Sequence, residues 1–364
     1  MIYGDDNMDI GAMIINSKKV KYIVLDELIK KLPVNTEEIN LFISIDSLLK
    51  SFYNPQVNEK VNILDSDDQY MLSSEIINIA AHYRHYFWSR YQIPTNYFFY
   101  YSDKEADYCV RELPTYKSSF YGKRLYNKVE FRNLNKMIYE NLKLASLLSE
   151  YLPNIYIINT KTLEPSVLPY YIISKNGNSN EGLLNLILTN ERMEYQLANL
   201  DNTYILQMES DKSKIIGKND LINEVLLKKN KAKSTLDSNF YTTMLAISGV
   251  PNRDIVGIKG YGPSKANNKL NKLISNEEIM NNEISAKLNL IYDKITDDKS
   301  LQSLILKNYK VISIENLYKN ITPKEFHNID NQLRNKSDNM SLMEINDKYY
   351  QYYPLMLIEL MEGE

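Results

Sequence analysis

Short apolar runs that alternate with longer helical patterns are the feature that most limits what this 364-residue chain can fold into. They lie at residues 39–46, 96–101, 154–158 and 183–188, with a weaker fifth at 202–206. Between them, residues 73–92 and 130–151 have helical patterns. Strands that alternate with helices predict an α/β fold with a mainly parallel central sheet flanked by helices. In such sheets the functional groups gather at the carboxyl ends of the strands.

From about residue 218 the pattern turns helical and remains so to the last residue. No low-complexity linker separates the two halves, and nothing repeats at a fixed period. We expect four parts, namely an appended element at 1–38, an α/β core at 39–215, a helical region at 216–330 and a helical tail at 331–364. The first part has the pattern of a hairpin followed by a short helix.

Composition excludes several classes of protein. A single cysteine, Cys109, precludes an internal disulfide and a cysteine-built zinc site. His82 and His85 lie in an aromatic helical stretch and are expected to pack there rather than bind a metal. No apolar run is long enough to span a membrane, and the N-terminus lacks the order of a signal peptide, so we expect an intracellular, cytoplasmic protein, in the host cytoplasm if it is viral. With a net charge of −3, any contact with DNA must come from local basic patches.

One such patch is a glycine-rich turn that runs directly into a helix. The segment 257–266 reads GIKGYGPSKA, with glycines at 257, 260 and 262 and a proline that suits an early helical position. A turn of this kind can press its amides against a phosphate, while Lys265 and Lys269 add positive charge and Ser264 adds a hydroxyl. The turn therefore predicts a clamp on a nucleic-acid backbone. The alternative is an ordinary corner between two helices that happens to use glycine.

Read in chain order, several segments resemble those of one family. They are the strand ending in Asp46, RELPTYK at 111–117, LTNERMEYQL at 188–197, the glycine turn at 257–266 and KNYKVISI at 307–314. This order resembles the 5′-nuclease superfamily of flap endonucleases and 5′→3′ exonucleases, over about residues 40–320. The resemblance implies that Arg111, Lys117 and Arg124 approach the scissile phosphate. It also implies that the turn is a helix–three-turn–helix that binds double-stranded or branched DNA, with a K⁺ ion held by backbone carbonyls.

The carboxylates that this family uses to hold two divalent ions are depleted here. The resemblance leaves Asp46, Asp103, Glu164 and Glu191 as residual acids. At five other acidic positions of the family this chain has Ser166, Val167, Met193, Val250 and Arg253. Two divalent ions in such a pocket would be badly under-neutralised. The residual acids are then either structural or the ligands of a single Mg²⁺, at Asp46, Asp103 and either Glu164 or Glu191.

These observations leave three hypotheses for the function. The leading one is a catalytically inactive or severely impaired DNA-binding or assembly subunit of a phage replication, transcription or virion complex. The second is an active, Mg²⁺-dependent 5′→3′ exonuclease or flap endonuclease whose acids have moved to Glu105, Glu194, Asp201 or Asp254. The third is a structural protein that does not contact DNA and docks a protein partner through residues 1–38 or the tyrosine-rich segment 348–361, although that segment would equally serve as an amphipathic helix that closes the core.

Overall fold

A computed structural model describes the parts of the chain that position the site. The described residues are 35–45, 47–48, 76, 79–80, 83–102, 106–117, 139–143, 145–146, 149, 154–176, 182–207, 214–227, 236–274 and 292–334. Predictions that fall elsewhere lie outside the described residues, namely those on 1–34, Asp46, His82, Asp103, Glu105, Arg124 and 348–361. Among the described helices, none combines the length and the apolar character that a membrane span requires.

The centre of the molecule is a six-stranded sheet with the order β3-β2-β1-β4-β5-β6. Its strands are β1 (Glu38–Ser44), β2 (Thr95–Tyr101), β3 (Ile155–Asn159), β4 (Leu183–Leu188), β5 (Thr203–Gln207) and β6 (Lys214–Ile216). The first five strands pair in parallel, and β6 pairs with β5 in the antiparallel sense. The predicted α/β fold and its five parallel strands are thus confirmed. The short edge strand β6 was not expected, because a three-residue run has no readable alternation.

The inner strands β1 and β4 are mainly apolar and buried on both faces, as in parallel sheets whose two faces are both covered. Strand β4 is buried along its whole length, and β1 is buried at every residue but its first. Three asparagines interrupt this apolar surface at one level of the sheet. The side-chain amide of Asn96 on β2 donates to Asn40 Oδ1 on β1 (3.0 Å), and Asn40 donates to Asn185 Oδ1 on β4 (3.2 Å). The register places these three residues opposite one another, so a slip of any strand would leave buried amides without partners.

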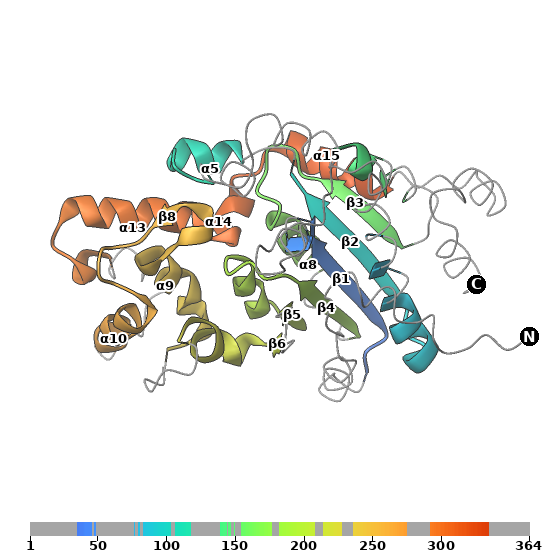
Figure 1. Cartoon of the computed structure of the whole chain (residues 1–364), viewed down its shortest axis with the longest axis horizontal. Helices are drawn as coiled ribbons and strands as arrows, with labels where there is room; N and C mark the ends of the chain where they lie inside the picture. The colour runs from blue at the N-terminus through green and yellow to red at the C-terminus, as the bar shows by residue number, and fades with distance from the viewer. Residues whose placement is uncertain are drawn as a thin grey trace, which may run out of the picture.

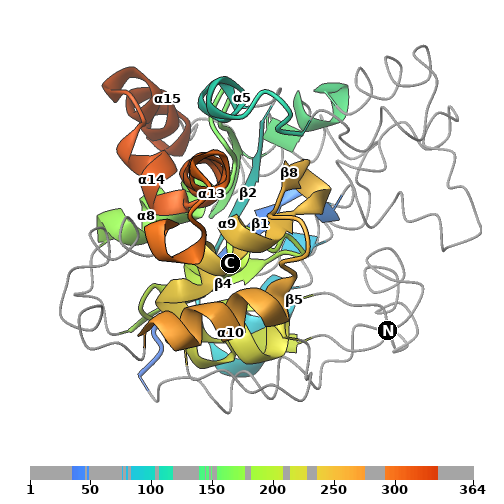
Figure 2. The same cartoon turned by 90° about the vertical axis from the view of Figure 1, so that its left-hand side faces the viewer.

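Helices pack around the sheet and form a second region beyond one of its ends (Figure 1). The helices are α5 (Asp107–Glu112), α8 (Val167–Asn176), α9 (Tyr241–Ser248), α10 (Pro263–Ile274), α13 (Lys299–Ile312), α14 (Ile314–Lys319) and α15 (Pro323–Arg334), with π-helical turns at His85–Ser89 and Leu221–Leu226. Short 3-10 turns span Glu194–Asn199, Lys218–Asp220, Ser238–Phe240 and Pro251–Arg253. In Figure 2, α13 lies between α5, α9 and α14. It therefore joins the α/β core to the helical region.

Helix α8 corrects one expectation from the sequence. Pro165 and Pro169 predict that no regular helix continues beyond a first turn, yet α8 runs for ten residues from Val167 to Asn176. Pro169 is only the third residue of that helix, and the N–H groups of a first helical turn have no partner within the helix in any case. The missing donor therefore costs nothing there, and the helix continues along α14.

Candidate metal-replacement cluster and DNA-binding turn

The loops at the carboxyl edge of the sheet bring together residual acids that are far apart in sequence. Glu164 lies in the loop between β3 and α8, and Glu191 follows β4. Both carboxylates are buried, with 2 % and 0 % of their surfaces exposed. A hairpin from the helical region faces them, consisting of β7 (Gly249–Val250), a 3-10 turn that ends at Arg253, and β8 (Ile255–Val256).

The Arg253 side chain lies between these two acids. Its Nη1 forms an ion pair and a short hydrogen bond with Glu164 Oε1, and its Nε donates to Glu191 Oε2 at 3.3 Å. Asn252, the residue before it, donates its side-chain amide to the same Glu191 oxygen at 2.9 Å. The guanidinium is itself buried, with 3 % of the residue exposed. One fixed cation therefore bridges the two described residual acids.

A second cation and a phenol occupy the other oxygen of Glu164. Lys117 Nζ lies 3.3 Å from Glu164 Oε2, and the Tyr116 hydroxyl donates to that oxygen at 2.5 Å. Arg253 Nη1 donates in turn to the Tyr116 oxygen at 3.0 Å, and the Lys117 backbone N–H donates to the Arg253 carbonyl at 2.9 Å. We call these six residues the buried cluster, although Asn252, at its edge, is itself exposed: Tyr116, Lys117, Glu164, Glu191, Asn252 and Arg253.

The positive charges of the buried cluster explain how its two carboxylates can be buried away from solvent. Burial opposes the ionised form of Glu164, but the nearby Arg253 and Lys117 charges and the Tyr116 hydrogen bond outweigh it and lower its pKa to about 2. Two carboxylates face one guanidinium and one ammonium, so the cluster is neutral overall when all four are ionised. A divalent ion is not needed to balance these acids.

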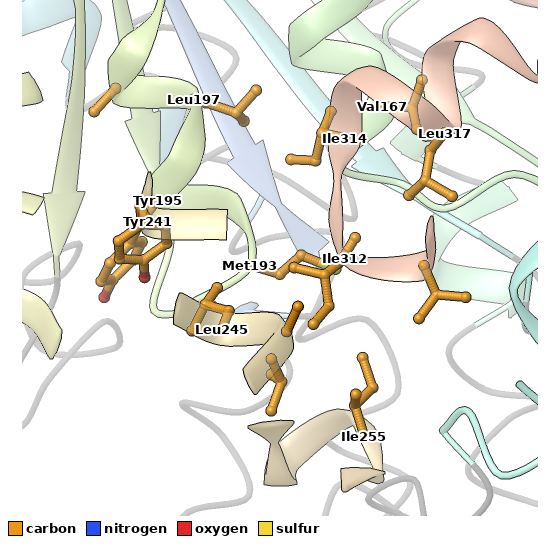
Figure 3. Close-up of a cluster of buried hydrophobic side chains, with 14 of the residues drawn as sticks. Val167, Met193, Tyr195, Leu197, Tyr241, Leu245, Ile255, Ile312, Ile314 and Leu317 are labelled. Carbon is orange, nitrogen blue, oxygen red and sulfur yellow. The ribbon is translucent and has the colours of Figure 1, made fainter. Parts of the chain in front are cut away.

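Three of the other positions where the family resemblance expects acids have become part of the hydrophobic core. Val167, Met193 and Val250 are 1 %, 0 % and 0 % exposed and belong to one apolar cluster. Figure 3 shows Val167 and Met193 within that cluster, among side chains from the helical region. Restoring a carboxylate at any of them would bury a charge in apolar surroundings.

A single-ion site that uses Asp46 or Asp103 stays a prediction, because both lie outside the described residues. The described residues form no divalent-ion site by themselves at this edge. They contain no group of three or more histidine, cysteine, aspartate or glutamate side chains placed to hold one. Both oxygens of Glu164 contact positively charged side chains or a phenol, and a cation approaching Glu164 and Glu191 would meet the Arg253 guanidinium. Like charges repel, so this arrangement opposes metal entry.

The suggested substitute acids that the structure describes, Glu194, Asp201 and Asp254, are not gathered into a new set. Asp201 precedes β5 and so belongs to the opposite, amino edge of the parallel sheet. Asp254 is partly exposed in a left-handed conformation just after the 3-10 turn. Glu194 is buried near the cluster, and its burial raises its pKa to about 7, although hydrogen bonds from Thr189 and Tyr100 and the Arg253 charge partly oppose this. Of the described candidates, Glu194 is buried and interacts electrostatically with Arg253 and Glu164.

The two described basic residues predicted after β2, Arg111 and Lys117, lie in different environments. Arg111 is exposed on α5, with its guanidinium 5.2 Å from the centre of the Tyr108 ring. Lys117 is 5 % exposed and ion-paired with Glu164, so in this structure it neutralises an acid instead of facing a phosphate. Cys109 is buried next to them, and burial raises the pKa of its thiol, which makes the thiol unreactive.

In the glycine turn, two of the glycines are required by the fold and one is not. Gly257 packs against the end of α9, because a Cβ placed on it would lie 2.2 Å from the Ser248 carbonyl carbon. Gly260 has a φ of +79°, a conformation that side chains disfavour. Gly262 has neither constraint, since no atom lies within 4 Å of a Cβ built there. The surface at Gly262 is therefore open to an approaching group.

The helix after the turn presents a basic surface. α10 begins at Pro263, as predicted, and the Gly262 carbonyl accepts the Lys265 and Ala266 amides at 3.0 Å each. Lys259 and Lys265 are exposed, while Ser264 and Lys269 are partly exposed. Lys265 Nζ lies 4.6 Å from the centre of the Tyr261 ring. The sequence of α10 contains three lysines and no acid, so this part of an acidic chain is locally positive.

Sheet order, the acid-bearing edge and the glycine turn together define a 5′-nuclease-like fold, as comparison with solved structures bears out. The T5 D15 protein co-crystallized with metal ions superimposes with a TM-score of 0.51 at 13 % identity, covering 90 % of this chain and 99 % of that one. The bacteriophage T5 D15 flap endonuclease, as a pseudo-enzyme–product complex with DNA and metal ions, gives 0.50 at 14 % identity, with the same coverage. No model of a protein family matches the chain, and no curated protein does.

Proposed function

We propose that this chain is a nucleic-acid-binding protein of 5′-nuclease-like fold that binds double-stranded or branched DNA and does not cleave it, or cleaves it with severely impaired activity. The observation that carries the proposal is the Arg253 guanidinium between Glu164 and Glu191. A two-metal mechanism requires a negative pocket that holds both ions beside the scissile phosphate. In this chain a fixed guanidinium lies between the two described residual acids of that pocket, and with Lys117 it balances their charge.

DNA binding is supported by the glycine turn at 257–266, which follows Arg253 in the same stretch of chain. Only a few residues separate Arg253 from the glycine turn, where Gly262 is open and Lys259, Lys265 and Lys269 lie at the surface. Backbone amides at the start of a helix and nearby lysines bind phosphates without reading bases. The chain would thus bind the DNA backbone without cleaving it, as expected of an assembly subunit in a phage replication, transcription or virion complex.

One of the similar structures supports the combination of DNA binding with lost or impaired cleavage. It is a flap endonuclease in which an aspartate is replaced by lysine, described as a pseudo-enzyme and crystallized in a product complex with DNA and metal ions. A basic residue in place of an aspartate is therefore compatible with a DNA complex in this fold.

DNA binding is tested with a fluorescent duplex that carries a 5′ flap, by anisotropy over a series of salt concentrations. We expect binding that weakens steeply as salt rises, and a Lys265→Ala, Lys269→Ala double variant with a shallower salt dependence, because two phosphate contacts are lost. A Lys310→Ala variant is the matched control, since Lys310 pairs with Glu112 on the surface between α13 and α5. Binding that is absent in the wild type, or unchanged in the double variant, would contradict the proposed interface.

Cleavage is tested on the same substrate with Mg²⁺ or Mn²⁺. We expect intact DNA after incubation with an excess of protein. Rapid cleavage that disappears in an Asp46→Ala variant would instead favour an active metal-dependent nuclease. A protein that neither binds nor cleaves the flap duplex would favour the third hypothesis, a structural protein that acts through partners.

A further inference from the structure

The buried cluster joins four separate segments of the chain. Glu164 and Glu191 come from loops after two strands of the sheet, Lys117 comes from the segment after α5, and Arg253 comes from the hairpin of the helical region. The backbone bond from the Lys117 N–H to the Arg253 carbonyl fixes the hairpin against that segment. The ion pairs of Arg253 therefore hold the helical region on the acid-bearing edge of the core.

We propose that Arg253 is a built-in structural cation, which holds this edge together in the absence of metal and keeps divalent ions out of it. The inference deepens the proposed function, because it gives the physical reason why the metal chemistry would be lost. It does not depend on DNA binding. Its direct consequence is that removing the guanidinium should expose a latent divalent-cation site between Glu164 and Glu191.

The geometry explains why a guanidinium can take this position. An arginine is charged at every physiological pH, and its planar fork donates several hydrogen bonds at once. Arg253 uses that fork to contact Glu164, Glu191 and the Tyr116 oxygen. It satisfies buried acids from two loops, which is the neutralising role that a divalent ion plays, but it offers no coordination position for a water or a phosphate.

Removal of the guanidinium would leave the two acids short of positive charge. In an Arg253→Ser variant, Glu164 and Glu191 would remain buried with Lys117 as their nearby cation, so the cluster would carry a net charge of −1. Truncating one partner of a buried ion pair is strongly destabilising, because the remaining charges are left uncompensated. The vacated space lies directly between two carboxylates, and carboxylate oxygens are the ligands that Mg²⁺, Mn²⁺ and Ca²⁺ prefer.

The experiment measures thermal unfolding of the full-length chain in EDTA and in millimolar Mn²⁺. For Arg253→Ser we expect a reduced Tm in EDTA and a rise of roughly 5 °C or more with Mn²⁺, as expected when a ligand binds only the folded state. An Arg253→Ser, Glu164→Gln double variant should lose this response, because one of the two carboxylates is gone. A Lys310→Ser variant, which breaks the exposed pair with Glu112, is the control and should show the small Mn²⁺ response of the wild type.

Two results would overturn the inference. One is an Arg253→Ser variant with no greater Mn²⁺ response than the wild type. The other is a wild-type response to Mn²⁺ that requires Glu164. If Arg253→Ser accumulates only as insoluble protein, its refolding is compared with and without Mn²⁺, and recovery that requires Mn²⁺ supports the inference while failure in both contradicts it.

These outcomes separate the inference from the proposed function. A failure of Arg253→Ser to respond to Mn²⁺ would leave the DNA-binding and cleavage results unaffected. Rapid cleavage by the wild type would contradict the proposed function, whatever the unfolding temperatures of the variants.

Discussion

Two single substitutions in the glycine turn separate the part of it that the fold needs from the part that we propose contacts DNA. Both add one methyl group, at Gly257 or at Gly262. At Gly257 the new Cβ would lie 2.2 Å, 2.4 Å and 2.6 Å from the Ser248 carbonyl carbon, the Ser248 oxygen and the Gly249 nitrogen. At Gly262 it would meet no protein atom within 4 Å.

The magnitudes are set by these surroundings. All three atoms near Gly257 belong to the backbone, which cannot rotate away, so Gly257→Ala should destabilise the protein by about 3 kcal/mol or more. At Gly262 two small effects oppose each other. Alanine is worse than glycine before the first residue of a helix, but it also restricts the unfolded chain, so the net change should stay within about 1 kcal/mol.

For DNA affinity the order of the two variants should be reversed, since Gly262→Ala should weaken binding directly although it hardly changes stability. If a phosphate approaches the turn at Gly262, a methyl group there displaces it from the helix amides. Loss of one charge-assisted hydrogen bond costs about 1.5–3 kcal/mol, which corresponds to a roughly 10- to 100-fold weaker Kd. Gly262→Ala should thus fold normally and bind poorly.

Chemical denaturation measures the stability of both variants, and anisotropy with the 5′-flap duplex measures their affinity. Gly257→Ala is assayed for binding only at temperatures where circular dichroism shows it folded. Unchanged affinity in a stable Gly262→Ala protein would refute the placement of the phosphate, and normal stability of Gly257→Ala would refute the packing argument.

Buried polar groups and a surface pair lead to three further expected outcomes. Because the pKa of Glu194 is raised from 4.5 to about 7 in the folded protein, the wild type loses stability as the pH rises through this range. Glu194→Gln has no such carboxylate, so it should be more stable than the wild type by up to about 3 kcal/mol at pH 8 and by little at pH 4. Denaturation series at the two pH values measure the difference. Asn40→Leu should cost about 1–3 kcal/mol because the buried Asn185 Oδ1 loses its donor and the Asn96 amide keeps only its bond to Glu38. An Asn40→Leu, Asn185→Leu double variant should lose less than the sum of the two single changes in a double-mutant cycle. By contrast, Lys310→Ala removes a largely exposed pair with Glu112 and should change the free energy of unfolding by less than about 1 kcal/mol.

The five parallel strands could be predicted from the sequence because each is a mainly apolar run that is largely buried. Their alternation with helices indicated a mainly parallel sheet, and the structure confirms the α/β class. The length of α8 could not be predicted from Pro169 alone, since the effect of a proline depends on its position within the helix. A local pattern cannot specify that position when the start of the helix is itself unknown.

The sequence indicates most members of the buried cluster but not the contacts between them. The sequence indicates Glu164, Glu191 and Lys117 as separate candidate residues, and the resemblance places the positive Arg253 at an acidic position of the family. That Arg253 pairs with those acids depends on the packing of the hairpin against the sheet edge, which sequence spacing does not reveal. A buried arginine in place of an aspartate, in a chain that keeps other acids of the site, is the signal that could have predicted the ion pairs.

The most direct test of the central claim is a crystal structure of the wild-type protein soaked in Mn²⁺, with anomalous scattering recorded at the manganese edge. We predict no anomalous peak between Glu164 and Glu191, and continuous density for the Arg253 guanidinium that bridges them. A manganese peak between these two carboxylates, with the Arg253 side chain displaced, would contradict the account.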